Sequence, residues 1–177
     1  MHSGSTVIRS MLVDTGRLSA FDDGWLCWKG RDHRDSTIRL DSKVSVMMAI
    51  KDHIGEPWRM VVGDEKGRVK IFSIPNLELI ETFTTDDSPI RSLCAAGDSA
   101  DRLLAGTELG SIYHLGTRVP GRSICLFNVD SAVTSLHRSG DRIHLMTGWS
   151  RHVKDWRGEN ISDSIGGRRR GLAALPI

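Results

Sequence analysis

The feature that most constrains this chain is an internal repeat of about 43 residues. Gly63, Gly106 and Gly148 occupy the same place in three similar segments, and they are separated by 43 and 42 residues. The position 43 residues before Gly67 is Gly24, which identifies an earlier copy. The four copies lie within residues 17–28, 59–72, 102–115 and 142–156. A period of this length indicates repeated supersecondary units that stack on one another.

Each copy predicts four short strands. The expected first strands are residues 7–13, 44–50, 90–95 and 133–137. A second strand ends at a small residue, a tight turn follows, and an alternating third strand closes on a bulky side chain: Trp28, Phe72, Leu115 or Trp156. The expected fourth strands are residues 36–40, 78–83 and 122–127, with the short segment 160–163 as the candidate in the last copy. Four strands in about 43 residues are typical of a propeller blade, whereas a helical repeat needs an apolar period of 3.6 that the copies lack.

Composition places the chain among ordinary globular proteins. It has 177 residues, of which 39% are hydrophobic and 26% charged, and its formal net charge is +2. These values exclude a disordered chain and a histone-like or polyacidic one. The segment at residues 1–6 lacks a basic signal region, and no apolar run is long enough to span a bilayer. We therefore expect a cytoplasmic protein that does not contact a membrane.

The residues that usually carry catalysis do not form a known motif. The three cysteines, Cys27, Cys94 and Cys125, each lie in an apolar run, and we expect them to be small buried side chains rather than disulfide or zinc ligands. The seven histidines show no metal-ligand spacing, and no phosphate-binding loop or nucleophile elbow is present. The sequence therefore predicts no cofactor, no metal and no catalytic residue.

One stretch resembles the WD-repeat β-propeller family. Residues 69–74, 79–83 and 89–93 are similar in order to that family's third strand, fourth strand and following first strand, and the resemblance covers about residues 5–163. Asp23, Lys66 and Leu109 stand where the family's turn aspartate would be. We therefore expect apolar packing, rather than the family's buried polar cluster, to hold the blades together.

The resemblance implies an all-β propeller of about four WD40-like, four-stranded blades. The expected blades are residues 5–40, 44–83, 90–127 and 132–163, followed by a basic flexible tail at residues 164–177. Four blades leave three alternatives: a closed small ring, a homodimer that completes an eight-bladed ring, or completion by a different protein. An open half-ring exposes two faces and an unpaired edge, which favours association.

The resemblance also implies a docking rim, formed by the loops between second and third strands and between blades. These loops contain nine acidic and three basic residues, so the rim is expected to attract a basic protein partner. Aspartate is also a common turn residue, which is the structural explanation of the same pattern. Trp149 is either a partner anchor or a contact with a neighbouring blade. The candidate partner-binding residues are Asp22, Asp23, Asp64, Glu65, Asp86, Asp87, Glu108, Trp149 and Arg151.

The function predicted from these observations is a non-catalytic protein–protein interaction scaffold. One alternative is a propeller enzyme or ligand-binding protein with a site at the central mouth. Another is a nucleic-acid adaptor that uses the arginines of residues 168–170, although three arginines alone make nucleic-acid binding an unfavoured prediction.

Overall fold

The computed structural model describes residues 4–32, 34–51, 59–95, 103–116, 121–148 and 150–160. The described residues form only strands, turns and loops, which confirms the all-β prediction. None of them belongs to a helix long and apolar enough to cross a membrane. Trp149, the tail at residues 164–177 and most of the candidate strand 160–163 lie outside the described residues.

Fifteen strands make four antiparallel sheets, and within each sheet every strand pairs with its neighbours in the sequence. The first sheet contains β1 (Val7–Val13), β2 (Gly16–Phe21), β3 (Trp25–Gly30) and β4 (Asp35–Arg39). The second contains β5 (Val44–Ile50), β6 (Arg59–Asp64), β7 (Arg68–Ser73) and β8 (Leu79–Thr84). The third contains β9 (Ile90–Ala95), β10 (Leu103–Thr107), β11 (Ser111–Leu115) and β12 (Ser123–Asn128). The fourth contains β13 (Val133–Ser139), β14 (Arg142–Thr147) and β15 (Ser150–Lys154).

The sheets share one register, which confirms the internal repeat at the level of structure. The first two strands of every sheet are interrupted by a β-bulge after their first residue pair, such as Val44 with Asp64 or Ile90 with Thr107. A bulge inserts one residue and increases the local twist of the strand. Its recurrence gives each sheet the same entry geometry.

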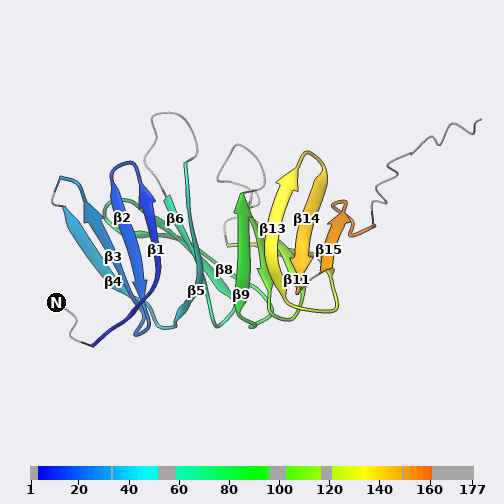
Figure 1. The fold of residues 1–177 in the computed structure, drawn as a ribbon, viewed down its shortest axis with the longest axis horizontal. Coiled ribbons are helices and arrows are strands. Elements are labelled where there is room, and N and C mark those ends of the chain that lie inside the picture. The colour runs from blue at the N-terminus through cyan, green and yellow to red at the C-terminus, as the bar shows by residue number, and fades with distance from the viewer. Residues whose placement is uncertain are drawn as a thin grey trace, which may run out of the picture.

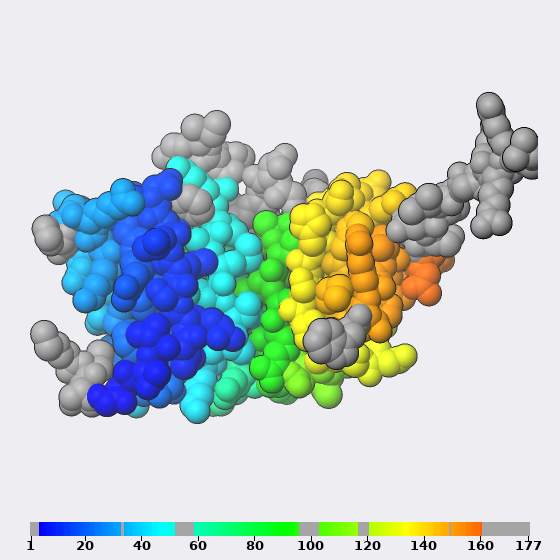
Figure 2. Space-filling view, viewed as in Figure 1, coloured from blue at the N-terminus to red at the C-terminus, as the bar shows by residue number. Residues whose placement is uncertain are grey.

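The four sheets stack face to face in an open arc. Three separate apolar clusters fill the spaces between the first and second, second and third, and third and fourth sheets. Figure 1 shows the first sheet (blue) and the fourth (yellow and orange) at opposite ends of this arc, and Figure 2 shows the same order in the packed atoms. The sheets do not close into a ring.

The turn between the second and third strands of the first three sheets depends on glycine. Gly24, Gly67 and Gly110 have φ values of 87°, 71° and 91°, in the left-handed region that favours glycine. Each glycine carbonyl accepts a hydrogen bond from the loop that leads to the next sheet, donated by the backbone N–H of Leu40, Thr85 and Val129 at 2.9–3.0 Å. The 43-residue spacing of these glycines therefore fixes where successive sheets join.

The bulky side chains that close the third strands differ in burial. Trp28, Phe72 and Leu115 are buried, as expected, but Trp156 is half-buried. The expectation that all three cysteines are buried is confirmed for Cys27, but Cys94 is half-buried and Cys125, on the outermost strand of its sheet, is exposed. In the fourth sheet Asn160 forms a single bridge to Lys154, so the described residues contain no full fourth strand there.

Candidate interaction surface

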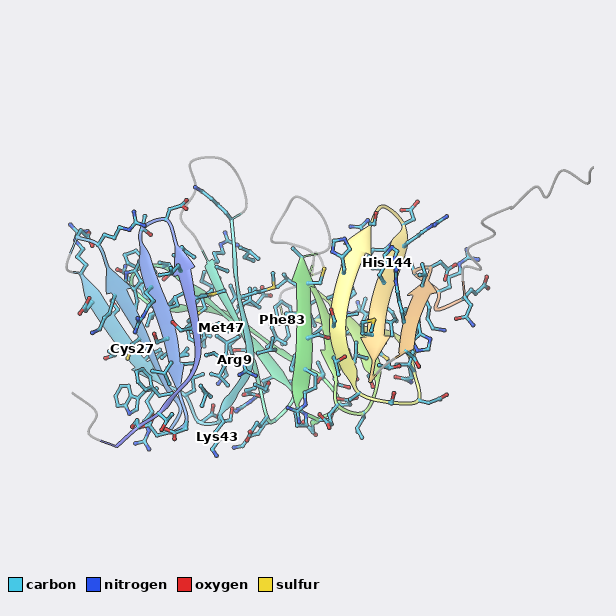
Figure 3. The ribbon with its side chains drawn as sticks, viewed as in Figure 1. Arg9, Cys27, Lys43, Met47, Phe83 and His144 are labelled. Carbon is cyan, nitrogen blue, oxygen red and sulfur yellow. The ribbon has the colours of Figure 1, made fainter. Side chains whose placement is uncertain are left out.

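The loops of the expected docking rim lie along one edge of the stack. Each first strand begins at this edge and each second strand ends there, so the turns between second and third strands and the loops between sheets gather along the lower edge in Figure 1. Figure 3 shows Lys43, in the loop between the first two sheets, at this edge. The residues Asp22, Asp23, Asp64, Glu65, Asp86, Asp87 and Glu108 all belong to these turns and loops or end the strands that lead into them.

A buried carboxylate organises the rim between the first and second sheets. Asp64 is 1% exposed and accepts hydrogen bonds from the Ser42 hydroxyl, from Arg68 Nε at 3.0 Å and from the backbone N–H groups of Lys66 and Arg68 at 2.9 and 2.8 Å. Such a saturated buried carboxylate costs free energy to disrupt, because removal of one partner leaves a charge unpaired. Asp64 therefore holds the turn and offers no free oxygen to a partner.

Asp41 extends the same cluster outward. Its carboxylate accepts hydrogen bonds from both terminal nitrogens of Arg68, at 2.5 and 2.9 Å, and from the Lys70 ammonium at 2.7 Å. The hydrogen bonds from Arg68 and Lys70 hold the pKa of the Asp41 carboxyl well below its usual range. The loop that leaves the first sheet is thus tied to the third strand of the second sheet by three charged side chains.

A second polar cluster repeats this design between the second and third sheets. Asp86 accepts hydrogen bonds from the hydroxyls of Ser88 at 2.9 Å, Thr107 at 3.2 Å and Ser111 at 2.5 Å. Burial alone raises the pKa of Asp86, but the hydrogen bonds from Ser111, Ser88 and Thr107 outweigh it, and the net shift is downward. The expectation that apolar packing alone holds the sheets is therefore incomplete, since polar clusters also join them at the rim.

The remaining predicted acidic residues stay at or near the surface of the rim. Asp22 and Asp23 accept hydrogen bonds from the Thr6 backbone N–H at 3.0 Å and the Ser5 hydroxyl at 2.5 Å. Glu108 forms an ion pair with Arg91. The exposed carboxylates of the rim are Asp23, Asp41, Glu65, Asp87, Glu108 and Asp130, and its exposed cations are Arg39, Lys43, Lys66 and Arg91.

The structure adds two features that the sequence reasoning missed. Leu109, at the tip of the turn between β10 and β11, is 67% exposed and stands directly beside Glu108. A cavity of about 400 Å³ also opens between Asp22, Asp23 and the loop at residues 39–43. An apolar residue in a turn was the available signal for Leu109, whereas the cavity depends on how two loops meet.

Arg151 does not lie with these residues. It is on β15, on the face of the fourth sheet that points away from the third sheet, and its Nη2 is 3.2 Å from His144 Nδ1. The expected grouping of Arg151 with the acidic rim is therefore not seen.

The two end faces of the arc differ chemically from the faces between sheets. The first three sheets place buried aliphatic side chains at two positions that face the next sheet: Leu18, Val61 and Leu104 at one, and Leu26, Val69 and Ile112 at the other. By register, the fourth sheet carries His144 and Arg151 at these positions. Its outer face is therefore polar where the other sheets have core.

A size difference accompanies this change. A third position that faces the next sheet lies two residues further along the second strand, and it is Gly63 in the second sheet and Gly106 in the third, where an added Cβ would lie 2.6–2.7 Å from Ile90 or Val133 of the next inner strand. The fourth sheet has Met146 at this position. A fifth sheet with the same geometry would have to make room for the Met146 side chain.

The opposite end carries charged side chains beside an exposed apolar one, Leu12, which is 79% exposed and lies opposite Arg17 in the register of β1 and β2. Buried Met60, Leu103 and Ile143 occupy one position that faces the preceding sheet, and the first sheet has exposed Arg17 there. Lys29 stands where the second and third sheets have Phe72 and Leu115 and where the fourth sheet has half-buried Lys154, whose ammonium lies over the Phe127 ring of the third sheet. Terminal units of a stacked repeat commonly carry such polar outer faces, because nothing covers them.

In the part of the chain that the structure describes, no group of three or more His, Cys, Asp or Glu side chains is arranged to hold a metal ion. Burial raises the pKa of the Cys27 and Cys94 thiols, which disfavours the thiolate form that a nucleophile requires.

Comparisons with known proteins give a fold likeness. No protein-family model matches the chain. A stretch of 68 residues is 37% identical to an uncharacterized membrane protein of Arabidopsis thaliana, and it covers 37% of this chain and 11% of that protein. The chain thus matches about a tenth of that relative's length.

Two solved structures resemble the whole arc. The crystal structure of the computationally designed Ika4 protein has a TM-score of 0.66 and 19% identity, over 86% of this chain and 92% of that one. The computationally designed Ika8 protein has a TM-score of 0.68 and 17% identity, over 88% of this chain and 48% of that one. At these identities the likeness concerns the fold alone.

Proposed function

We propose that the chain is a WD-repeat-like, propeller-type scaffold of four blades that binds a protein partner through its acidic rim and has no catalytic activity. The observation that carries this proposal is the set of exposed carboxylates on turns that are fixed by the Asp64 and Asp86 clusters. Fixed turns lose little conformational freedom on binding, which favours a rigid docking surface. The three free thiols support a reducing, cytoplasmic setting.

The chemistry of the rim indicates a basic partner with an apolar contact point. Exposed carboxylates outnumber exposed cations there, so the rim attracts Lys- and Arg-rich segments. Leu109 beside Glu108 supplies an exposed apolar side chain within this acidic setting. Such a pairing suits a partner segment that combines basic residues with one apolar side chain.

The end faces bear on how the arc is completed. A homodimer that forms an eight-bladed ring would place Arg17 and Lys29 of one copy against His144 and Arg151 of the other, with Met146 in the way of close packing. Burial of unpaired cations is strongly unfavourable. The end faces therefore favour an open, capped arc of four blades over the closed small ring and the homodimer, while the third alternative, completion by a different protein, stays a prediction.

The test is binding of a fluorescent basic decapeptide rich in Lys and Arg that also carries one Leu, with a neutral decapeptide as the probe control. We expect the double variant Glu65→Lys/Asp87→Lys to weaken binding by about 2 kcal/mol, at about 1 kcal/mol per reversed surface charge. The matched control is Asp14→Lys/Asp32→Lys, which changes two exposed acids on the opposite edge. Equal affinity of the two double variants for the basic peptide would overturn the proposed rim.

A further inference from the structure

The outer face of the fourth sheet contains a concavity that the scaffold function does not use. Its volume is about 370 Å³, within the range of small-molecule sites. The residues that line it come from all three strands, and the polar ones among them are Ser135, His137, Ser139, His144 and Arg151. Figure 3 shows His144 on β14 of this sheet. No lining residue carries a carboxylate, so the charge of the concavity is positive or neutral.

The donors in this concavity have a defined arrangement. Arg151 Nη2 lies 3.2 Å from His144 Nδ1. A guanidinium only donates hydrogen bonds, so Nδ1 accepts and the neutral His144 ring carries its proton on Nε2. The rings of His137 and His144 lie 6.1 Å apart. Two imidazoles, one guanidinium and two serine hydroxyls therefore surround the same space.

Ser135 shows that the concavity lies where a following sheet would pack if the repeat continued. Its counterpart in the third sheet, Ser92, donates a hydrogen bond of 2.8 Å to the Val133 carbonyl of the next inner strand. The fourth sheet has no following sheet in the described chain, so the Ser135 hydroxyl faces the concavity. Positions that join sheets elsewhere thus supply polar donors here.

We propose that this concavity binds the phosphate group of a small phosphomonoester. A phosphate dianion presents three acceptor oxygens, and it matches a site with a guanidinium, imidazole N–H groups and hydroxyls as donors and no carboxylate. The proposal is independent of the acidic rim, because the rim follows one edge of the stack, whereas the concavity lies on the outer face of the fourth sheet and attracts the opposite charge.

The test is titration of the full chain with inorganic phosphate, phosphoserine and serine, followed by histidine side-chain NMR signals in a phosphate-free buffer. We expect inorganic phosphate and phosphoserine to bind with dissociation constants on the order of 1 mM or tighter and to shift the His137 and His144 signals, while serine has no effect. Arg151→Gln should weaken phosphoserine binding about tenfold or more, because it removes the charged donor. Arg17→Gln, on the other end face, should leave binding within about twofold.

Three results would overturn the proposal: no shift of the two histidine signals, binding of inorganic phosphate without phosphoserine, or equal weakening by Arg151→Gln and Arg17→Gln. The last result would mean that phosphate follows overall charge rather than this site. Both arginines are exposed. Thermal melting of each variant verifies that it is folded, and His144→Gln provides a second variant within the concavity.

Discussion

Leu104 and His144 occupy the same position in successive sheets, and the two residues give a direct comparison of core and end face. Leu104 is 0% exposed and belongs to the cluster between the third and fourth sheets, whereas His144 faces outward. Leu104→Ala removes buried carbon atoms and leaves a cavity between packed sheets, which costs about 3 kcal/mol within a range of about 2–5 kcal/mol. His144→Ala removes a side chain with no sheet against it, and the expected change is within about 0.5 kcal/mol.

The assay is urea unfolding followed by tryptophan fluorescence, since the chain has five Trp residues. Leu104→Ala should lower the midpoint without a change in the slope of free energy against urea concentration. The melting temperature should fall by about 6–12 °C, at about 2–4 °C per kcal/mol for a domain of this size. Similar losses for Leu104→Ala and His144→Ala, or a loss below about 1 kcal/mol for Leu104→Ala, would refute the placement of these two positions.

Three further predictions concern packing, backbone conformation and pH. Trp28→Ala should destabilise by about 3–5 kcal/mol and Trp156→Ala by less than about 2 kcal/mol, because Trp28 is 1% exposed and Trp156 is half-buried; equal urea midpoints would contradict this. Gly110→Ala should lower the stability by about 2 kcal/mol or more, because the added Cβ would lie 2.0 Å from a backbone oxygen of the facing loop. The Cβ of Gly140→Ala would meet no atom within 4 Å, so this control should lose less stability, and thermal melting compares the two variants. The pKa of Asp86 is lower in the folded protein than its unfolded value of about 4. Ionised Asp86 therefore stabilises the fold at any pH above the unfolded pKa, and this stabilisation is lost as the pH falls through the folded pKa. Asp86→Asn should therefore flatten the loss of stability below about pH 4, and an unchanged profile would contradict the hydroxyl cluster.

The strands were predictable because their signals are local. The expected first strands at residues 7–13, 44–50 and 90–95 coincide with β1, β5 and β9, and the expected fourth strands lie within one residue of β4, β8 and β12. Apolar alternation and turn glycines fix such elements wherever the chain bends back on itself. The period of 43 residues then gives the number of sheets.

The rim clusters were not predictable from the same signals. Asp64 stands in a turn-like sequence, where aspartate is usually exposed, yet the Arg68 and Ser42 side chains bury it. Their meeting depends on the loop from the previous sheet, a contact between positions 22 residues apart. Local pattern carries no information about such a contact.

The polar character of the end face of the fourth sheet could be predicted in part. The series Leu18, Val61, Leu104 and His144 changes from apolar to ionisable at its last member, and an alignment of all four copies by strand register exposes that change. The bulges move this register by one residue in each first strand, so alignment of the glycines alone does not reveal which positions share a face. Met146, which occupies in the fourth sheet the position of Gly106 in the third, is a second signal of the same kind.

The separation of the two end faces in solution tests the account most directly. Spin labels on cysteines introduced at Arg17 and Met146, with the native cysteines replaced by serine, allow this distance to be measured by electron–electron double resonance. Adjacent packed sheets are about 10 Å apart, and three such spacings separate the end sheets along the arc, so we predict a distribution centred above about 20 Å. A short distance within one chain, near that of adjacent sheets, would mean that the ring closes and would contradict the capped open array.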